Sequence, residues 1–186
     1  MKLRLLLLMT LLAASCGVAD NFVGELTAID PSDGPYARSA VVGINYPAGA
    51  PQVGVDIDSL VAEWGSLAEQ VDNLPMLVEM DGESMWVAES DASGVALDVI
   101  VNQDVVVLAQ LQIVDAAGES DESAAALVLS EFLAALNVGD PTGVFDQLGI
   151  ADPLFSERSE TLEVGELTIY LASNKDTILV GVTGAP

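Results

Sequence analysis

Residues 95–114, VALDVIVNQDVVVLAQLQIV, contain two runs of alternating side chains on either side of a polar turn. The first run has apolar residues at odd-numbered positions, and so does the second, where Gln110 and Gln112 take even-numbered positions. Alternation with a period of two is typical of a β-strand that is buried on one face. The stretch therefore predicts a β-hairpin and makes antiparallel pairing the basis of the fold.

The alternation also predicts a register for this hairpin. A two-residue loop would place Gln110 and Gln112 on the apolar face, whereas a three-residue loop at 102–104 keeps that face continuous. With the three-residue loop, we expect Val99 to lie opposite Val107.

Two further hairpins are expected, one on each side of the central one. Asp81-Gly82 is a strong signal for a two-residue type I′ turn, and a four-residue loop at 173–176 would join the last two alternating runs. Gly165 is expected to be a bulge or a bend, because the apolar residues before it are out of phase with those after it. The expected cross-strand pairs are Val78–Met85, Met76–Val87, Leu171–Ile178, Ile169–Val180 and Leu167–Val182.

Two longer segments have the apolar spacing of amphipathic helices. The first begins near Asp58, the expected N-cap, and Pro75 stops it. The second follows the acidic loop 118–122 and ends near Gly139, a suitable C′ residue, after which Pro141 begins a short third helix. The positions expected to be buried are Leu60, Val61, Trp64, Leu67, Ala68 and Val71 in the first helix, and Ala125, Val128, Leu129, Phe132, Leu133 and Leu136 in the second.

The expected fold class is α+β, an antiparallel sheet built of hairpins with two main helices packed on one face. With strand candidates at 22–29 and 41–46, the order is two strands, a helix, four strands, a helix, a short helix and two strands. Residues 22–186 are expected to form a single domain. Hydrophobic residues make up 51% of the chain and charged residues 18%, which favours a folded core over disorder.

The N-terminal residues have the layout of an export signal. Lys2 and Arg4 precede an apolar run at 5–12, and small residues follow it. The apolar run is much too short to span a membrane, which needs about 20 residues. An ordinary secretory signal, cleaved after Ser15 or after Ala19, is one interpretation of this layout.

The segment Ala13-Ala14-Ser15-Cys16 resembles the lipobox of bacterial lipoproteins. The resemblance implies that residues 1–15 are a signal peptide, that Cys16 is lipidated and begins the mature protein, and that 16–21 include a short tether. Because Gly17 and not Asp follows the cysteine, it also implies the periplasmic side of the outer membrane if the host is Gram-negative. Two or more acyl chains would anchor the protein stably.

Charge and composition exclude several classes of protein. After cleavage, three basic residues, Arg38, Arg158 and Lys175, would remain against 29 acidic ones, a net charge of −26. Such a chain does not bind nucleic acid by neutralising phosphates, and its membrane contact should come from the lipid anchor alone. The chain has no histidine, so Ser-His-Asp catalysis and histidine metal centres are impossible. No cofactor is expected, since no phosphate-binding glycine loop or dinucleotide fingerprint occurs.

Acidic residues near turns are weak candidates for a metal site. Asp30, Asp33, Asp56 and Asp58 flank turns and could converge on a calcium ion. However, no twelve-residue calcium loop is present, and aspartates at turns have a local backbone explanation. We therefore predict no metal ligand and no catalytic residue.

The sequence as a whole predicts a lipid-anchored, non-enzymatic protein of the cell envelope that binds or scaffolds a partner protein or an apolar ligand. Two alternatives stay open at this point. One is a hydrolase that uses a pair of carboxylates, which are plentiful in this chain. The other is a calcium-dependent adhesive module.

Overall fold

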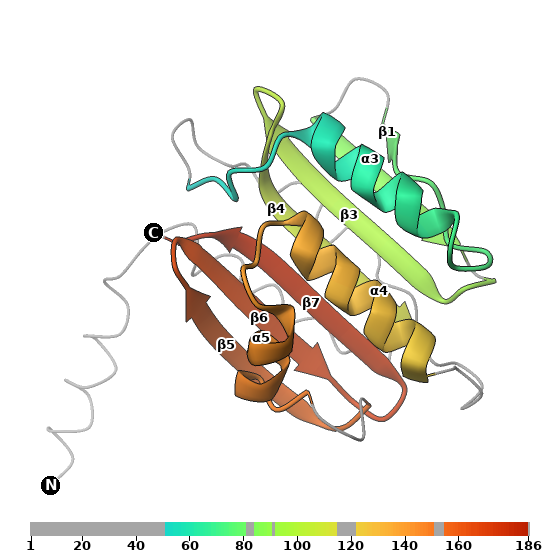
Figure 1. Cartoon of the computed structure of the whole chain (residues 1–186), viewed down its shortest axis with the longest axis vertical. Helices are drawn as coiled ribbons and strands as arrows, with labels where there is room; N and C mark the ends of the chain where they lie inside the picture. Colours follow the sequence, from blue (N-terminus) through green and yellow to red (C-terminus); the bar gives the residue numbers. More distant parts are fainter. Residues whose placement is uncertain (1–50, 81–83, 91, 115–121, 151–154, 186) are drawn as a thin grey trace, which may run out of the picture.

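The computed structural model describes residues 51–80, 84–90, 92–114, 122–150 and 155–185. These residues form a seven-stranded antiparallel sheet and three helices, so the α+β class is confirmed (Figure 1). The expected leader, Cys16 and the strand candidates at 22–29 and 41–46 lie outside the described residues. The elements are α3 (Ile57–Ala68), β1 (Val78–Glu79), β2 (Met85–Ser90), β3 (Val95–Asn102), β4 (Val105–Val114), α4 (Glu122–Ala135), α5 (Pro141–Gln147), β5 (Arg158–Val164), β6 (Leu167–Ser173) and β7 (Thr177–Gly184).

The strand order in the sheet is β1-β2-β3-β4-β7-β6-β5. Each half is a meander of consecutive antiparallel strands, and the two halves meet where β4 pairs with β7. The sequence predicted two strands after the third helix, whereas the structure has three. The additional strand is β5, which joins β6 through a tight turn at Gly165-Glu166, where Gly165 has a φ of 63°. Gly165 is therefore a turn residue, and it leaves Val164 opposite Leu167 on the same face.

The central hairpin has the predicted faces from Val95 to Ile100 and from Leu108 onward, but not the predicted register, and next to the turn Val106 takes the helix-side position that was predicted for Val105 and Val107. Val99 lies opposite Ala109, not Val107. A two-residue turn at Gln103-Asp104, with φ values of 53° and 65°, replaces the predicted three-residue loop. A β-bulge follows, because Ile100 pairs with Leu108 while Val101 pairs with Val106. The bulge adds one residue on β4 and so restores the alternation that the turn alone would have inverted.

The first hairpin differs from its predicted register in the same way. Val78 lies opposite Val87, not Met85. The N–H of Met80 donates to the carbonyl of Met85 at 2.9 Å, so these two residues are the last pair before the loop. The connection between them is therefore longer than the expected two-residue turn. The residue pairs shift by two positions, which leaves every side chain on its predicted face.

The last hairpin has a shorter loop than predicted. Ile178 lies opposite Ser173, not Leu171, and Lys175-Asp176 alone form the loop. The Oδ1 atom of Asn174 fixes this turn by accepting from the N–H groups of Asp176 and Thr177 at 2.7 and 2.8 Å. A local side-chain interaction of this kind competes with a longer loop and sets the register.

The N-cap of α3 is Asp56, not Asp58. One Asp56 oxygen accepts from the backbone N–H of Ser59 at 2.8 Å, and the other accepts from its hydroxyl at 2.7 Å. Asp58 lies within the first turn and is exposed. The helix ends at Ala68, before the predicted stop at Pro75.

The C-terminal end of α4 is closed by Asn137 and not by Gly139. Asn137 has a left-handed φ of 58°, and the N–H of Val138 reaches back to the carbonyl of Leu133 at 3.0 Å. This is the hydrogen-bond pattern of a Schellman motif, in which asparagine can replace glycine. The predicted short helix with Pro141 in its first turn is confirmed as α5.

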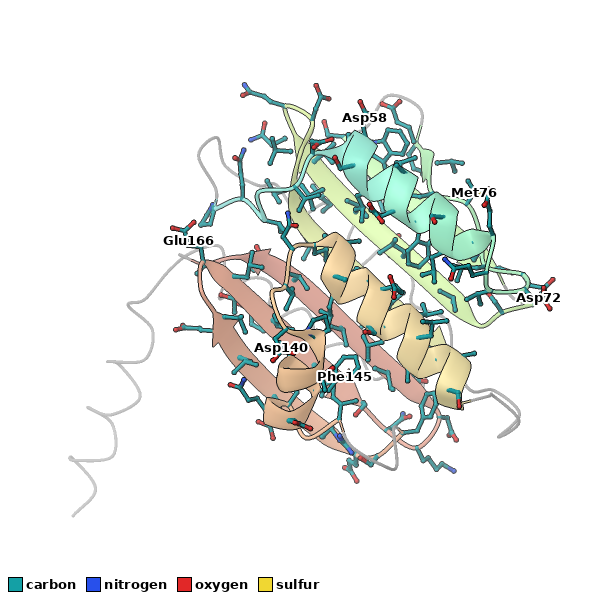
Figure 2. All side chains as sticks on the ribbon, viewed as in Figure 1. Asp58, Asp72, Met76, Asp140, Phe145 and Glu166 are labelled. Carbon is teal, nitrogen blue, oxygen red and sulfur yellow. The ribbon has the colours of Figure 1, made fainter. Side chains whose placement is uncertain are left out.

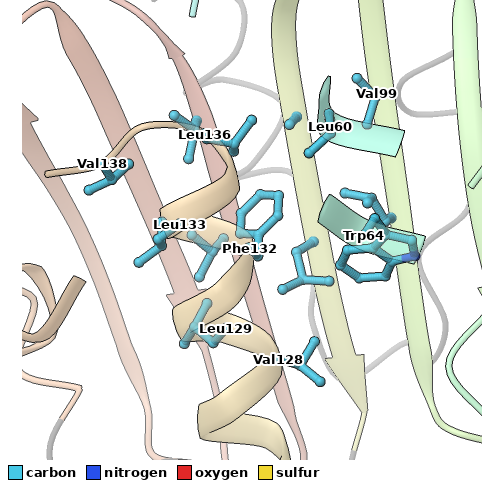
Figure 3. Close-up of a cluster of buried hydrophobic side chains, with 14 of the residues drawn as sticks. Leu60, Trp64, Val99, Val128, Leu129, Phe132, Leu133, Leu136 and Val138 are labelled. Carbon is cyan, nitrogen blue, oxygen red and sulfur yellow. The ribbon is translucent and has the colours of Figure 1, made fainter. Parts of the chain in front are cut away.

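One face of the sheet packs against the helices and is called here the helix face. All three helices lie on this side in Figure 1, and the core fills the space between them and the sheet. The buried α4 stripe is confirmed at every predicted position, and Figure 3 shows most of it together with Leu60 and Trp64 of α3. No helix in the described part of the chain is long and apolar enough to cross a membrane. The helix face consists mainly of Ala88, Val95, Leu97, Val99, Ala109, Leu111, Ile113, Leu167, Ile169, Leu171, Ile178, Val180 and Val182.

Side chains between these positions point to the opposite side, which is called here the second face. One cross-strand row runs over it from β2 to β5 through directly paired residues. This row has a very different composition from the helix face, with polar residues at most of its positions. Its members, in order, are Val87, Asp98, Gln110, Gly181, Tyr170 and Thr161.

Candidate functional site

A groove of about 420 Å³ lies between the two main helices and is the best candidate for a binding site in the described residues. Helices α3 and α4 pack side by side over the sheet, and the groove follows the line where they meet. It is lined by Gly54, Val55, Asp56, Ser59, Glu63, Trp64, Leu67, Glu131, Ala134, Ala135 and Asn137.

The floor of the groove is apolar. Trp64 and Leu67 lie beneath it and are only 1% and 3% exposed. The indole Nε1 of Trp64 donates to the carbonyl of Pro75 at 2.7 Å. This hydrogen bond fixes the ring and satisfies its only donor, so the groove receives an apolar aromatic surface.

The width of the groove depends on small residues. Ala134 and Ala135 lie on the α4 side, where larger side chains would fill the space against α3. They lie between the buried Leu133 and Leu136 at the C-terminal end of α4, next to the Asn137 cap. The groove therefore lies where the last turn of α4 presents alanines to α3.

The rim of the groove is acidic. Glu63 comes from α3 and Glu131 from α4, and both side chains are exposed. Asp56 adds a third carboxylate at one end, and no Lys or Arg is among the lining residues. An apolar floor with a negative rim suits a ligand group that is itself apolar and carries a positive charge or several N–H donors.

The carboxylate of Asp56 is already engaged in the helix cap. Hydrogen bonds from the hydroxyl and the backbone N–H of Ser59 hold the pKa of Asp56 below its ordinary value of 3.8, because both stabilise the ionised form. The side chain is fully exposed, and its role is to orient the first turn of α3 at the end of the groove.

Replacing Asp56 with Ala should lower the melting temperature more than replacing Asp58 with Ala, since only Asp56 caps α3. The effect should depend on pH. Because the folded-state pKa is lowered, the extra stability from the ionised group is present at neutral pH and is lost as the pH falls below 3.8 and through the folded-state value. The measurement is thermal unfolding from pH 7 to pH 2, with Asp56→Asn as a neutral capping residue. If the native protein melts above the Asp56→Asn variant by the same number of degrees at every pH down to 2, the prediction is wrong.

The candidate metal residues do not form a site in the described part of the chain. Asp30 and Asp33 lie outside it, Asp56 is the helix cap, and Asp58 projects from the first turn of α3 (Figure 2). Among the described residues, no group of three His, Cys, Asp or Glu side chains is placed to hold a metal ion. Asp56 and Asp58 are therefore explained by the local structure of the helix.

The groove residues carry no pattern in the sequence that predicts a site. Trp64 and Leu67 were predicted to be core residues, which they are, and the exposed Glu63 and Glu131 were not singled out. The one available signal was the pair of alanines at 134–135, at the end of a stripe of large apolar residues.

No protein-family model, curated protein or solved structure matches this chain.

Proposed function

We propose that this protein is a lipid-anchored, non-enzymatic binding protein of the cell envelope. In this proposal the groove between α3 and α4 receives a short segment of a partner protein that has an apolar side chain next to a basic one. The observation that supports it is the combination of an apolar floor, Trp64 and Leu67, with the carboxylates of Glu63 and Glu131 at the rim.

The size and openness of the site favour side chains over a large ligand. A volume of about 420 Å³ lies near the lower end of the range of about 300–1,000 Å³ that is usual for ligand pockets. Exposed carboxylates at a rim contribute more to the rate of association and to specificity than to affinity. We therefore expect weak and reversible binding that depends on salt.

The anchor proposed at Cys16 would hold this groove close to a membrane, because residues 17–21 form only a short tether. In a Gram-negative host this would be the periplasmic side of the outer membrane. At such a site, attachment to the membrane raises the effective concentration of the groove near partners in the same envelope layer.

Replacing Cys16 with Ser should release the protein from the membrane fraction completely. A thioether-linked lipid cannot form on serine, and the remaining chain would have a net charge of −26, which opposes adhesion to anionic lipid. Membrane fractionation is the measurement, with mass spectrometry of the native N-terminus as its control. An unmodified native N-terminus at Gly17 or beyond would refute the anchor.

Replacing both Glu63 and Glu131 with Gln should weaken binding of a basic apolar peptide about tenfold. Exposed ion pairs contribute up to about 1 kcal/mol each, and 1.4 kcal/mol corresponds to a factor of ten. Suitable probes are the peptides acetyl-LKLK-amide and acetyl-LELE-amide, titrated while tryptophan fluorescence is recorded. The matched control replaces two exposed carboxylates outside the groove, Glu69→Gln and Glu160→Gln, and should bind like the native protein.

Three outcomes would change the proposal. Equal binding of the two peptides would show that the rim does not select for charge. Binding of neutral dodecyl maltoside but of neither peptide would favour an apolar ligand. Binding that survives Ala135→Trp, which should fill the groove, would place the site elsewhere.

A further inference from the structure

Strand β5 forms one of the two edges of the sheet, and in the described part of the chain no strand lies beyond it (Figure 1). Most of its residues are exposed, namely Ser159, Glu160, Thr161 and Glu163. The other edge is β1, which has only two residues. Since strands in proteins usually have at least three residues, β5 is the edge that is long enough to pair with a further strand.

Strand β5 also lacks most of the features that protect a sheet edge from pairing with another chain. Such features are proline, lysine, β-bulges and very short strands. The sequence of β5, RSETLEV, contains neither proline nor lysine. Its pairing with β6 runs from Arg158 to Val164 without a bulge. The backbone of β5 is therefore regular enough to accept another strand.

The turn between β5 and β6 determines which backbone groups of β5 point outward. Gly165-Glu166 form a two-residue turn, and the geometry of such a turn makes Val164 and Leu167 a hydrogen-bonded pair. Bonded pairs alternate along an antiparallel ladder, so every second residue of β5 directs its N–H and C=O groups away from β6. These residues are Ser159, Thr161 and Glu163.

Apolar side chains of β5 also reach this edge. Leu162 and Val164 lie on the helix face, opposite Ile169 and Leu167 of β6. Both pack against the core, but they are only half-buried. Apolar residues of an added strand, placed opposite Leu162 and Val164, would extend the core by one strand.

The charge along the edge favours a basic partner. Exposed glutamates recur at every third position, at 157, 160, 163 and 166. The basic residue of β5, Arg158, already donates to the carbonyl of Gly149 and the hydroxyl of Ser156. A second copy of this chain, with a net charge of −24, would be repelled. Because opposite charges in cross-strand pairs are favourable, a segment with basic residues three positions apart suits this edge.

We propose that β5 accepts an extended basic segment of a partner protein as a further, antiparallel strand of the sheet. Basic residues of the segment lie opposite Glu160 and Glu163, and apolar residues lie opposite Leu162 and Val164. Main-chain hydrogen bonds supply the affinity and these side chains the specificity, as in other cases of strand addition. The site goes beyond the proposed function, because none of the residues that line the groove belongs to β5.

Peptide binding to the full-length protein tests the edge. In an antiparallel arrangement, the hexapeptide acetyl-VKITKT-amide places its two lysines opposite Glu163 and Glu160. It should bind and protect the amide N–H groups of Ser159, Thr161 and Glu163 from hydrogen exchange. The peptide acetyl-VEITET-amide should bind about tenfold more weakly, because its glutamates meet like charges. The tetrapeptides used for the groove are shorter than a typical strand and form too few main-chain bonds to occupy this edge.

Methylation of the peptide backbone separates strand addition from binding through side chains alone. N-methyl groups on the second and fourth residues of acetyl-VKITKT-amide, which face Glu163 and Thr161, should abolish binding. The same groups on the third and fifth residues point away from β5 and should leave binding unchanged. Both methylated peptides keep the charge and the side chains of the original, and neither alters the protein.

Two variants of the protein complete the test. Thr161→Pro removes an outward N–H group but none that binds β6, and it should also abolish binding. Ala135→Trp, which should fill the groove, should have no effect on this peptide, so the outcome is independent of the proposed function. The proposal would be overturned by binding that survives methylation of the second and fourth residues, by protection confined to other parts of the chain, by loss of binding in Ala135→Trp, or by no binding at all.

Discussion

Replacing Phe132 with Ala should lower the free energy of unfolding by about 3–5 kcal/mol, the usual range for removing a buried aromatic side chain. Phe132 is 0% exposed and lies within the cluster that joins α4 to α3, with Trp64, Leu129 and Leu133 around it (Figure 3). Because a domain has only about 5–15 kcal/mol of stability in total, this loss is a large share of it. The measurement is urea unfolding followed by circular dichroism.

The matched control for this prediction is Leu127→Ala on the same helix. Leu127 is 39% exposed, so its truncation leaves no cavity and should change the stability by less than about 0.5 kcal/mol. Similar losses for the two variants would mean that α4 does not pack on the sheet through Phe132. Such a result would also remove the basis for the groove, since α4 forms one of its walls.

Raising NaCl from 0.05 to 1 M should raise the melting temperature by roughly 4–8 °C. Two like charges 10 Å apart in water repel by about 0.4 kcal/mol, so several such pairs cost about 2 kcal/mol, which corresponds to this shift for a chain of this size. Salt removes most of that cost, because the Debye length falls from roughly 10 Å at 0.1 M to about 3 Å at 1 M. Exposed acids such as Asp58, Asp72 and Glu166 occur in several regions of the surface (Figure 2).

The control for the salt effect is a variant with fewer exposed acids and the same core. Replacing Glu69, Glu160 and Glu163 with Gln should raise the melting temperature at low salt and reduce its rise with NaCl. A melting temperature of the native protein that does not change between 0.05 and 1 M NaCl would mean that the charges are too far apart to interact. A fall in melting temperature with salt would mean that ion pairs such as Lys175–Asp176, at 3.7 Å, outweigh the repulsion.

The alternation of side chains was sufficient to predict faces but not registers. Away from the bulge in the central hairpin, each of the three predicted hairpins pairs its residues two positions away from the predicted partner, so that Val99 meets Ala109 and Ile169 meets Val182. A shift of two preserves the face of every side chain, and the apolar pattern does not distinguish the two registers. The choice depends on local chemistry that the pattern does not contain, such as the Asn174 turn and the bulge after Gln103-Asp104.

The exact ends of the helices were also not predicted by the sequence pattern. Asp56 and Asp58 are equivalent as candidates for the N-cap in sequence, and the hydroxyl of Ser59 selects Asp56 by adding a second hydrogen bond. Asn137 was missed as the C-terminal cap because glycine two residues later is the stronger general signal. The groove was not predicted, since it depends on how α3 and α4 lie against each other, and the alanines at 134–135 were its one signal in the sequence.

The place of β7 beside the central strand β4 has a consequence for the order of folding. The strands that flank it, β4 and β6, are both earlier in the chain, and β7 is the only described strand that connects the two meanders. Until residues 177–184 have joined, each meander has an open edge and the helix face is divided in two. Hence the barrier to folding should be dominated by closing the long loop that brings β7 beside β4.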